Sequence, residues 1–429
     1  METEPIDSPA AASCPRWVML NRYGYRRDHS GIAETTLAAA AFPSTGRPFG
    51  VSFCLKAPPA SSIFLYDRED QREDTFMEEV VAAHGDCLLL EKMLHRDDAR
   101  STSSTNWDYF LYEAGSAAWL PSLSLLAACF FPMDYERLKV QYPSFKTSQR
   151  LYRAIVAAGY LKHWAQLEVT GDHTAELCVL RLGRCHGWDL NQDVPIVRVT
   201  GEALPLSKAG EPMRWWHTDA VVPAGDRFLC WVDYFHSVLL CDMASDAASP
   251  KLLHMPLPMK SDNGGWPWPS FPGSRPDPRW SMNLGATGVA ALRLVRVEPR
   301  CCSCCGPGET TCERGGRSGF TVTTWTLTLM MEDRRSMRWV EDGVIDGDEL
   351  WASLNYEGVP RVTLKYPIVS SADPDVVCFM VSEDEYVYRE GTKLWMVEVD
   401  TRSKALRSVV CEISDRWGEG YHLAAKLQC

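Results

Sequence analysis

Apolar residues in this chain occur in short runs that are separated by turn-forming residues. The clearest example is AVVPAGDRFLCWVDYFHSVLLCD at 220–242, in which one apolar run ends at Gly225-Asp226 and two further runs follow. The first of these further runs is rich in β-branched and aromatic residues, which favour strands. The stretch therefore predicts three short β-strands joined by tight connections.

Related stretches recur along the chain. VVAAHGDCLLL begins at Val80, the central copy begins at Val221, and IVSSADPDVVCFM begins at Ile368. The copies are separated by about three times a unit of about 48 residues, a period typical of propellers and other repeat proteins. Weaker copies lie between them, as hairpin-like pairs of runs at 163–181 and 288–329. The pattern thus indicates an internal repeat.

From this repeat we predict an all-β fold: a single β-propeller-like domain of about six four-stranded blades, with short helical decorations at 147–158 and 346–353. A β-sandwich array is the alternative. The domain is expected to span 15–412. A Pro-, Ala- and Ser-rich segment at 1–14 is expected to be disordered, and a C-terminal tail is expected at 413–429.

A single strand is expected at 16–20 (RWVML), because no strand-like partner lies next to it in the sequence. Closing a sheet into a ring removes its exposed edges. We therefore expect this strand to close the ring by pairing with the last blade, near 394–410.

The composition is that of a globular protein: of 429 residues, 45% are apolar, 23% are charged and 16 are tryptophan. The net charge of -12 argues against nucleic acid or an anionic membrane as a partner, because both require a cationic surface. The first residues lack the apolar core of a secretory signal, and the longest apolar run, at 123–131, is too short to cross a bilayer. The expected location is the cytoplasm or the nucleus.

Five cysteines lie close together in CCSCCGPGETTC, at 301–312. Thiolates bind Zn²⁺ tetrahedrally, and Cys302, Cys305 and Cys312 are the candidate ligands. Structural zinc sites generally use two separate CxxC-like pairs, whereas Cys302 and Cys305 make one such pair here and no fourth ligand is evident. We therefore expect a loop with free thiols, and neither a metal nor another cofactor.

Other candidate groups are better explained by packing and turns than by chemistry. Four cysteines share one position in the repeat and are expected in the core, and three aspartates precede strands and are expected in turns: Cys87, Cys178, Cys230, Cys378, Asp86, Asp226 and Asp375. Trp231, next to Cys230, is expected to pack between adjacent blades. His84, His217 and His236 lie near strand ends without a carboxylate or nucleophile at a recognised spacing.

Motifs of the common enzyme classes are absent. The sequence contains no Gly-rich phosphate loop, no GxSxG elbow and no HExxH. No catalytic residues are predicted, and the chain is not expected to be an enzyme.

Aromatic residues gather in a segment that cannot form strands, KSDNGGWPWPSFPGSRPDPRW at 260–280. Trp266, Trp268 and Phe271 are therefore candidate partner-binding residues, since rigid aromatic side chains contribute contact area with little loss of conformational freedom. The alternative is that this loop folds back and caps a blade.

Seven segments, taken in order, are similar to one known family: WVMLNRYGYRRD, VVAAHGDCLLLE, AELCVLR, WWHTDAVVPAGDRFLCWVDYFHSVLLCD, FTVTTWTL, DGVIDGDELWA and DPDVVCFMV. Over 15–412, and most specifically over 215–242, the chain resembles the plant family of domain of unknown function 1618 (DUF1618), which is expanded in grasses. The resemblance implies a propeller-like fold that looks related to F-box-associated domains, and it implies no catalytic residues. The residues before Trp17 leave no room for an F-box, so a ubiquitin-ligase adaptor role is not expected.

These observations favour a non-enzymatic module that binds a protein partner through loops on its rim. The alternative is a propeller-type hydrolase or lyase with a site in the central channel. Convergence of polar groups at one mouth of the channel would distinguish the two, because the fold by itself decides nothing about function.

Overall fold

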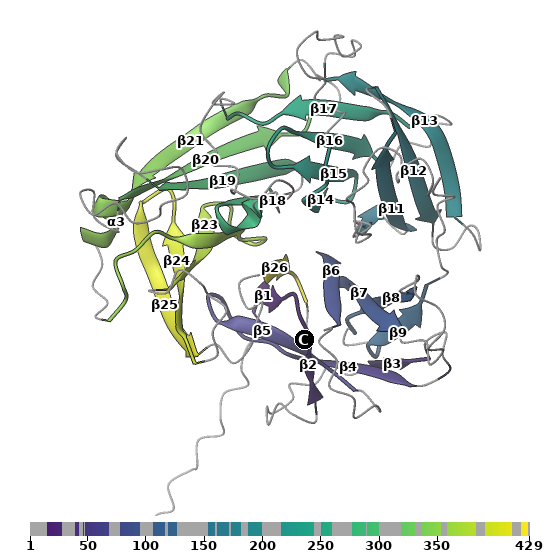
Figure 1. Ribbon diagram of the computed structural model, residues 1–429, viewed down its shortest axis with the longest axis horizontal. Coiled ribbons are helices and arrows are strands. Elements are labelled where there is room, and N and C mark those ends of the chain that lie inside the picture. Colours follow the sequence, from purple (N-terminus) through teal and green to yellow (C-terminus); the bar gives the residue numbers. More distant parts are fainter. Residues whose placement is uncertain are drawn as a thin grey trace, which may run out of the picture.

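The computed structural model of the chain describes residues 15–27, 39–42, 46, 48–67, 78–94, 106–115, 119–126, 153–158, 161–170, 173–181, 188–199, 216–243, 250–259, 277–288, 290–299, 319–330, 336–352, 358–382, 391–413 and 422–427. The described residues are almost entirely in β-strands, which form five hydrogen-bonded sheets around a central axis (Figure 1). The predicted all-β, propeller-like arrangement is confirmed, whereas the predicted count of about six blades is not.

The chain begins and ends in one sheet of order β26-β1-β5-β4-β3, with β2 beside β5. Its strands are β1 (Val18–Asn21), β2 (Tyr25–Arg26), β3 (Ala39–Ala41), β4 (Phe49–Cys54), β5 (Ser61–Tyr66) and β26 (His422–Ala425). Three further sheets are four-stranded meanders in chain order. They comprise β6 (Glu79–His84), β7 (Cys87–Leu94), β8 (Asn106–Glu113) and β9 (Ser122–Leu125); β18 (Met282–Thr287), β19 (Ala291–Pro299), β20 (Phe320–Thr328) and β21 (Trp339–Asp346); and β22 (Lys365–Val369), β23 (Val376–Val381), β24 (Lys393–Asp400) and β25 (Ala405–Ile413).

The remaining sheet has eight strands in the order β10-β11-β12-β13-β17-β16-β15-β14. They are β10 (Arg153–Ala158), β11 (Leu161–Val169), β12 (Thr174–Arg181), β13 (Trp188–Arg198), β14 (Ala220–Ala224), β15 (Phe228–Asp233), β16 (Ser237–Asp242) and β17 (Leu252–Pro256). Two antiparallel halves, β10–β13 and β14–β17, are joined where β13 and β17 pair in parallel, with Ile196 opposite Leu252.

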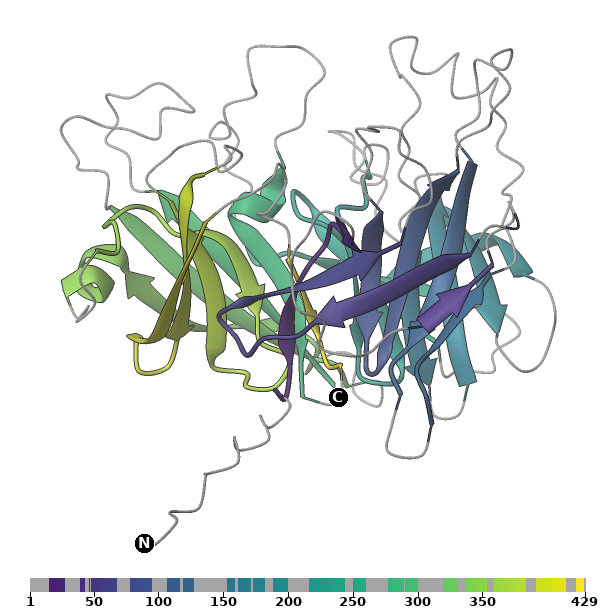
Figure 2. The same ribbon diagram turned by 90° about the horizontal axis from the view of Figure 1, so that it is seen from below.

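The innermost strands are β6, β10, β14, β18, β22 and β26, which contact one another in turn around the centre of the ring (Figure 1). Seen from the side, the strands run between the two ends of the ring (Figure 2). The end at which β14 and β18 begin is called the entry end below. A short 3-10 helix, η1 (Pro278–Trp280), directly precedes β18 there.

The sheets are buried on both faces, which explains why their strands carry continuous apolar runs instead of a clean alternation. All six residues of β15 are buried. Phe228, Cys230 and Val232 belong to an apolar cluster shared with β18–β21, whereas Leu229 and Trp231 belong to a cluster shared with β12 and β13. The prediction that Trp231 packs between adjacent units is confirmed, but Cys230 lies on the opposite face of the strand.

The ring is closed by β1 and β26, which pair antiparallel with Val18 opposite Ala425. On its other side β1 pairs in parallel with β5. The prediction that 16–20 pairs near 394–410 is therefore wrong, because the two edges of β1 pair with β26 and β5 instead. The partner strand comes from 413–429, the segment predicted as a tail.

Removal of β26 should open the ring. A chain truncated after Ile413 loses the buried side chains of Ala425 and Leu427, which are 2% and 1% exposed, and leaves β1 with a free edge. We expect its melting temperature in scanning calorimetry to fall by about 5 °C or more. A control chain truncated after Leu427 keeps β26 and should melt like the full chain; identical melting of the two truncated chains would exclude closure by β26.

The two predicted helical decorations have different outcomes. The helix α3 (Gly347–Ala352) confirms the helical turns predicted at 346–353. The helix predicted at 147–158 is wrong over its described part, because 153–158 forms the innermost strand β10, paired with β11. A short apolar run fits the period of a helix as well as that of a strand, and here pairing with the neighbouring strand selects the strand.

No helix in the described part of the chain is long and apolar enough to span a membrane.

Candidate functional site

Two aspartate–histidine pairs lie at the entry end. His217 and Asp219 precede β14, while Asp233 and His236 border the turn that joins β15 to β16. The Nδ1 atom of His217 lies 3.0 Å from Asp219 Oδ1, and Nδ1 of His236 lies 3.0 Å from Asp233 Oδ2. The two pairs are linked, because the backbone N–H of His217 donates to Asp233 Oδ2 at 3.1 Å.

The two carboxylates also hold the local backbone in place. Asp219 Oδ2 accepts a hydrogen bond from the N–H of Tyr234 at 2.9 Å, and Asp233 Oδ1 accepts one from the N–H of Phe235 at 3.0 Å. Bonds of this kind to the backbone of a tight turn are typical of aspartate. The side chains of Asp219 and Asp233 are only 5% and 0% exposed, and a buried carboxylate without such donors would be strongly destabilising.

Tyr234 fixes this turn against the neighbouring sheet. Its hydroxyl oxygen accepts a hydrogen bond from the N–H of Leu284 in β18 at 2.9 Å. Burial raises the pKa of Tyr234 far above its ordinary value, so the phenol remains protonated at neutral pH. The turn is therefore held on both sides by buried polar contacts.

The two imidazoles, in contrast, reach solvent: the side chains of His217 and His236 are 51% and 40% exposed. Because a carboxylate can only accept, each Nδ1 carries the proton, and each ring has its Nε2 on the side away from the carboxylate. This arrangement orients an imidazole as a general base or as a ligand-binding group. In the described part of the chain the ring of His236 bonds only to Asp233, so its other nitrogen can bind a molecule from solution.

The chemistry open to this site is hydrogen bonding and proton exchange. Among the described residues, no group of three or more His, Cys, Asp or Glu side chains is arranged to hold a metal ion. Within the described residues, the ring of His236 contacts no hydroxyl or thiol that it could activate as a nucleophile.

All three histidines have a carboxylate neighbour in the structure, although not at a spacing that a sequence motif records. His217 and His236 have theirs two and three residues away, in HTD and DYFH, where the spacing reflects a turn and matches no recognised enzyme motif. His84, at the end of β6, lies with its Nε2 3.7 Å from Asp226 Oδ1, at the end of the ring opposite the entry end. Burial lowers the pKa of His84 below its ordinary value.

The repeated cysteines and aspartates are where the sequence predicts them. Cys87, Cys178, Cys230 and Cys378 are buried, and Asp86, Asp226 and Asp375 lie in turns. Burial raises the pKa values of the Cys230 and Cys378 thiols, which disfavours the reactive thiolate. The candidate zinc ligands Cys302, Cys305 and Cys312, and the candidate partner-binding residues Trp266, Trp268 and Phe271, lie outside the described residues.

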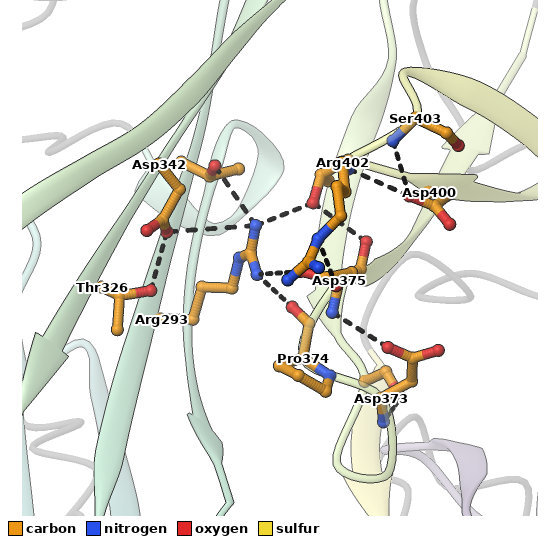
Figure 3. A network of polar contacts seen from close by, with 12 residues as sticks. Arg293, Thr326, Asp342, Asp373, Pro374, Asp375, Asp400, Arg402 and Ser403 are labelled. Atoms are coloured by element: carbon orange, nitrogen blue, oxygen red, sulfur yellow. Dashed lines mark hydrogen bonds and ion pairs between the residues drawn. The ribbon is translucent and has the colours of Figure 1, made fainter.

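A second polar cluster joins two sheets near the opposite end of the ring (Figure 3). Arg293 of β19 is buried between β18–β21 and β22–β25, with its side chain 6% exposed. Its guanidinium donates to the backbone oxygen of Pro374, to the hydroxyl of Thr401 at 2.7 Å and to the hydroxyl of Thr324 at 3.3 Å, and it lies 3.5 Å from Asp375.

Two further arginines extend this cluster toward the surface. Arg402 lies 2.9 Å from Asp375 (Figure 3). Arg407 bridges Asp373 at 2.9 Å and Asp400 at 3.0 Å. The charges neutralise one another, so the cluster is a structural connection between sheets.

A third polar cluster lies where the ring closes. The Ser61 hydroxyl donates to Glu412 Oε2 at 2.6 Å, and His422 Nε2 lies 3.0 Å from Ser61 Oγ. In a nucleophilic triad the histidine lies between the serine and the carboxylate, whereas here the serine lies in the middle. Burial lowers the pKa of His422 to about 4, so the imidazole is neutral at pH 7. The cluster connects β5, β25 and β26 and so stabilises the closure.

The decisive comparison is with a family model that covers the middle of the chain. Residues 231–378 match the family "Protein of unknown function (DUF1618)". The DUF1618 match runs from β15 into β23, and it includes Asp233, His236 and Arg293. It confirms the resemblance noted above for this part of the chain, and the description of DUF1618 assigns no activity.

Solved structures resemble the chain only distantly. A subtype N11 neuraminidase-like protein of A/flat-faced bat/Peru/033/2010 (H18N11) is 9% identical, with 93% of each chain covered and a TM-score of 0.26. An exo-1,5-α-L-arabinanase from a bovine ruminal metagenomic library is 10% identical, with 82% of this chain and 98% of that chain covered and a TM-score of 0.26. A Penicillium chrysogenum α-L-arabinanase complexed with arabinobiose is 7% identical, with 93% and 72% covered and a TM-score of 0.21. These scores are too low to support an argument about this chain, and no curated protein matches it.

Proposed function

We propose that this protein is a non-enzymatic module that binds a protein partner at the entry end of its ring. The observation that supports this proposal most is the position of the described residues on either side of the stretch that contains Trp266, Trp268 and Phe271. On its N-terminal side, the N–H of Leu257 donates to the backbone oxygen of His236 at 3.2 Å. On its C-terminal side, η1 leads into β18, whose Leu284 binds the Tyr234 hydroxyl at 2.9 Å.

The described residues on both sides of the aromatic stretch therefore bond to one turn, 234–236. The same turn carries the half-exposed ring of His236, and His217 lies next to it through Asp233. In this proposal the aromatic residues of the stretch supply the apolar anchors and the two imidazoles supply the polar contacts, a combination that protein interfaces use.

The alternative, a hydrolase or lyase with its site in the channel, has less support. In the innermost strands the acidic, basic and histidine side chains occur only at the first or last residue: Glu79, His84, Arg153, Lys365 and His422. The acidic and histidine members of this set are each paired inside the protein, with Arg22, Asp226 and Ser61. A catalytic channel needs polar groups that converge on a substrate.

The proposal includes a count of six blades. It treats β10–β13 and β14–β17 as separate blades that are joined along their outer strands, β13 and β17. Each blade then contributes one of the six innermost strands around the centre. It also includes the expectation of a cytoplasmic or nuclear protein in which no membrane or nucleic acid is the partner.

The test is a double substitution, Trp266→Ala with Trp268→Ala, in the full chain. We expect capture of the partner to be lost, as measured by affinity purification and quantitative mass spectrometry, because interface anchors of this type dominate binding. If the two side chains bind the partner and do not pack in the core, as proposed, the melting temperature should change by no more than about 2 °C.

The matched control replaces two exposed apolar residues elsewhere, Trp119→Ala with Leu120→Ala, whose side chains belong to residues 78% and 90% exposed. This control should keep every captured partner. The proposal is wrong if the Trp266/Trp268 variant keeps the same partners as the wild type, or if it unfolds, because the loop would then cap a blade.

A further inference from the structure

The imidazole of His422, in the strand that closes the ring, is held in one tautomer. The Ser61 hydroxyl donates its single hydrogen to Glu412 Oε2 at 2.6 Å, because a carboxylate can only accept. His422 Nε2, which lies 3.0 Å from Ser61 Oγ, must therefore be the donor in the bond between them. The proton of the neutral ring is thus on Nε2, and Nδ1 is a bare acceptor.

The surroundings of His422 Nδ1 do not accommodate a second proton. His422 as a whole is partly exposed, but its Nδ1 is buried and has no hydrogen-bond partner among the described residues. A proton on this atom would bury both a positive charge and a donor without an acceptor, and each is unfavourable. Burial accordingly lowers the pKa of His422 to about 4.

The charged groups around β26 do not offset this effect. The strands β1, β6 and β22 contact β26, while β5 and β25 reach it through Ser61 and Glu412. Glu412 lies 3.9 Å from Lys56, and Glu79 of β6 forms an ion pair with Arg22. Both carboxylates therefore have a cation of their own. The other titratable side chains on these strands, or directly after β26, are those of Tyr66, His84, Lys365, Tyr366, Cys411 and Lys426.

The strand β26 can open without the rest of the ring. It is the edge strand of its sheet and pairs only with β1, with His422 opposite Asn21. Its release breaks no strand pairing within the other four sheets. Local openings of this kind occur well below the free energy of global unfolding.

We propose that the closure of the ring is a pH-sensitive switch, in which protonation of His422 Nδ1 favours release of β26 from β1. The released strand has its imidazole in water, where the pKa of histidine is about 6.5. The released state therefore binds the proton more tightly than the closed state. The stabilisation of the closure is complete above about pH 6.5 and is lost progressively as the pH falls toward about 4. From pH 7 to pH 5 the opening equilibrium should rise about twentyfold.

The test is hydrogen–deuterium exchange of the full chain at pH 7 and pH 5, followed by mass spectrometry and corrected for the exchange of unprotected amides at each pH. Protection of 18–21 and 422–425 should fall about twentyfold at pH 5, because exchange there follows the opening of β26. Protection of β23 should not change in step with it. This comparison uses the wild-type chain, so it tests the proposal without any substitution.

His422→Gln identifies the group that titrates. Glutamine keeps an N–H that can donate to Ser61 Oγ, but it does not bind a proton in this pH range. Protection of 18–21 and 422–425 should then be the same at both pH values, whatever its absolute level in this variant.

The matched control is His254→Gln, because burial and the nearby charge of Arg198 lower the pKa of His254 to about 4 too, whereas His254 lies in β17 of another sheet. This control should keep the twentyfold change in 18–21 and 422–425. The proposal is overturned by equal protection of these segments in the wild type at pH 7 and pH 5. It is also overturned by an undiminished pH effect in His422→Gln, or by an equal loss of protection in all five sheets.

Discussion

Replacing Trp231 by alanine should lower the free energy of unfolding by about 3–5 kcal/mol, as expected for a fully buried aromatic side chain. Trp231 is 0% exposed and packs between the two halves of the eight-stranded sheet, in the cluster that includes Leu177, Ile196 and Leu239. Its removal leaves a cavity that the paired strands on either side cannot close. Urea unfolding followed by circular dichroism measures the loss.

The matched control for this substitution is Trp119→Ala. Trp119 is 78% exposed, so its removal should change the free energy of unfolding by no more than about 0.5 kcal/mol. A loss below about 1 kcal/mol for Trp231→Ala would show that β15 is misplaced between its neighbours.

Arg293→Ala should lower the free energy of unfolding by a similar amount, about 3–5 kcal/mol, because it removes one partner of a buried charged network. The substitution leaves the Pro374 carbonyl and the Thr401 hydroxyl without the guanidinium that bridges the two sheets. It also leaves the partly buried Asp375 without that cation. Arg293→Lys should be intermediate, because lysine keeps the charge but cannot form the planar set of hydrogen bonds.

Arg402→Ala is the control in the same network. Arg402 contacts Asp375 at 2.9 Å, but its side chain is 80% exposed, so the ion pair is screened by water and should contribute no more than about 1 kcal/mol. Urea unfolding of the three variants under one set of conditions gives the comparison. Equal, small losses for Arg293→Ala and Arg402→Ala would mean that the buried network does not stabilise the contact between the sheets.

The strands were predictable from the sequence because their surroundings repeat. Each strand that is buried on both faces needs apolar residues at successive positions, and each turn needs Gly, Asp or Pro, so the pattern at 220–242 recurs at Val80 and Ile368. The burial of Trp231 follows from the same pattern. So does the burial of the repeated cysteines, because a small apolar side chain is what these positions accommodate.

The wrong predictions are of two kinds. Some concern contacts between segments that are far apart in the sequence, and others concern apolar patterns that fit a helix as well as a strand. The strand at 16–20 needs a partner, but nothing in its own residues distinguishes β26 from β25. The apolar residues at 153–158 fit a helix as well as a strand, and the choice depends on β11 beside them. The arrangement of Arg293 depends on Pro374 and Thr401, which belong to another sheet.

The sequence by itself determined the class of fold and the positions of most of the strands, because local apolar runs and turn residues suffice for these. Only the tertiary structure decided how the ring closes and which polar groups meet. The His217–Asp219 and His236–Asp233 pairs form because a turn brings neighbouring residues together around buried carboxylates. Trp231 packs against β12 and β13 because strand register puts it on that face, and register is set by pairing across strands that no local pattern records.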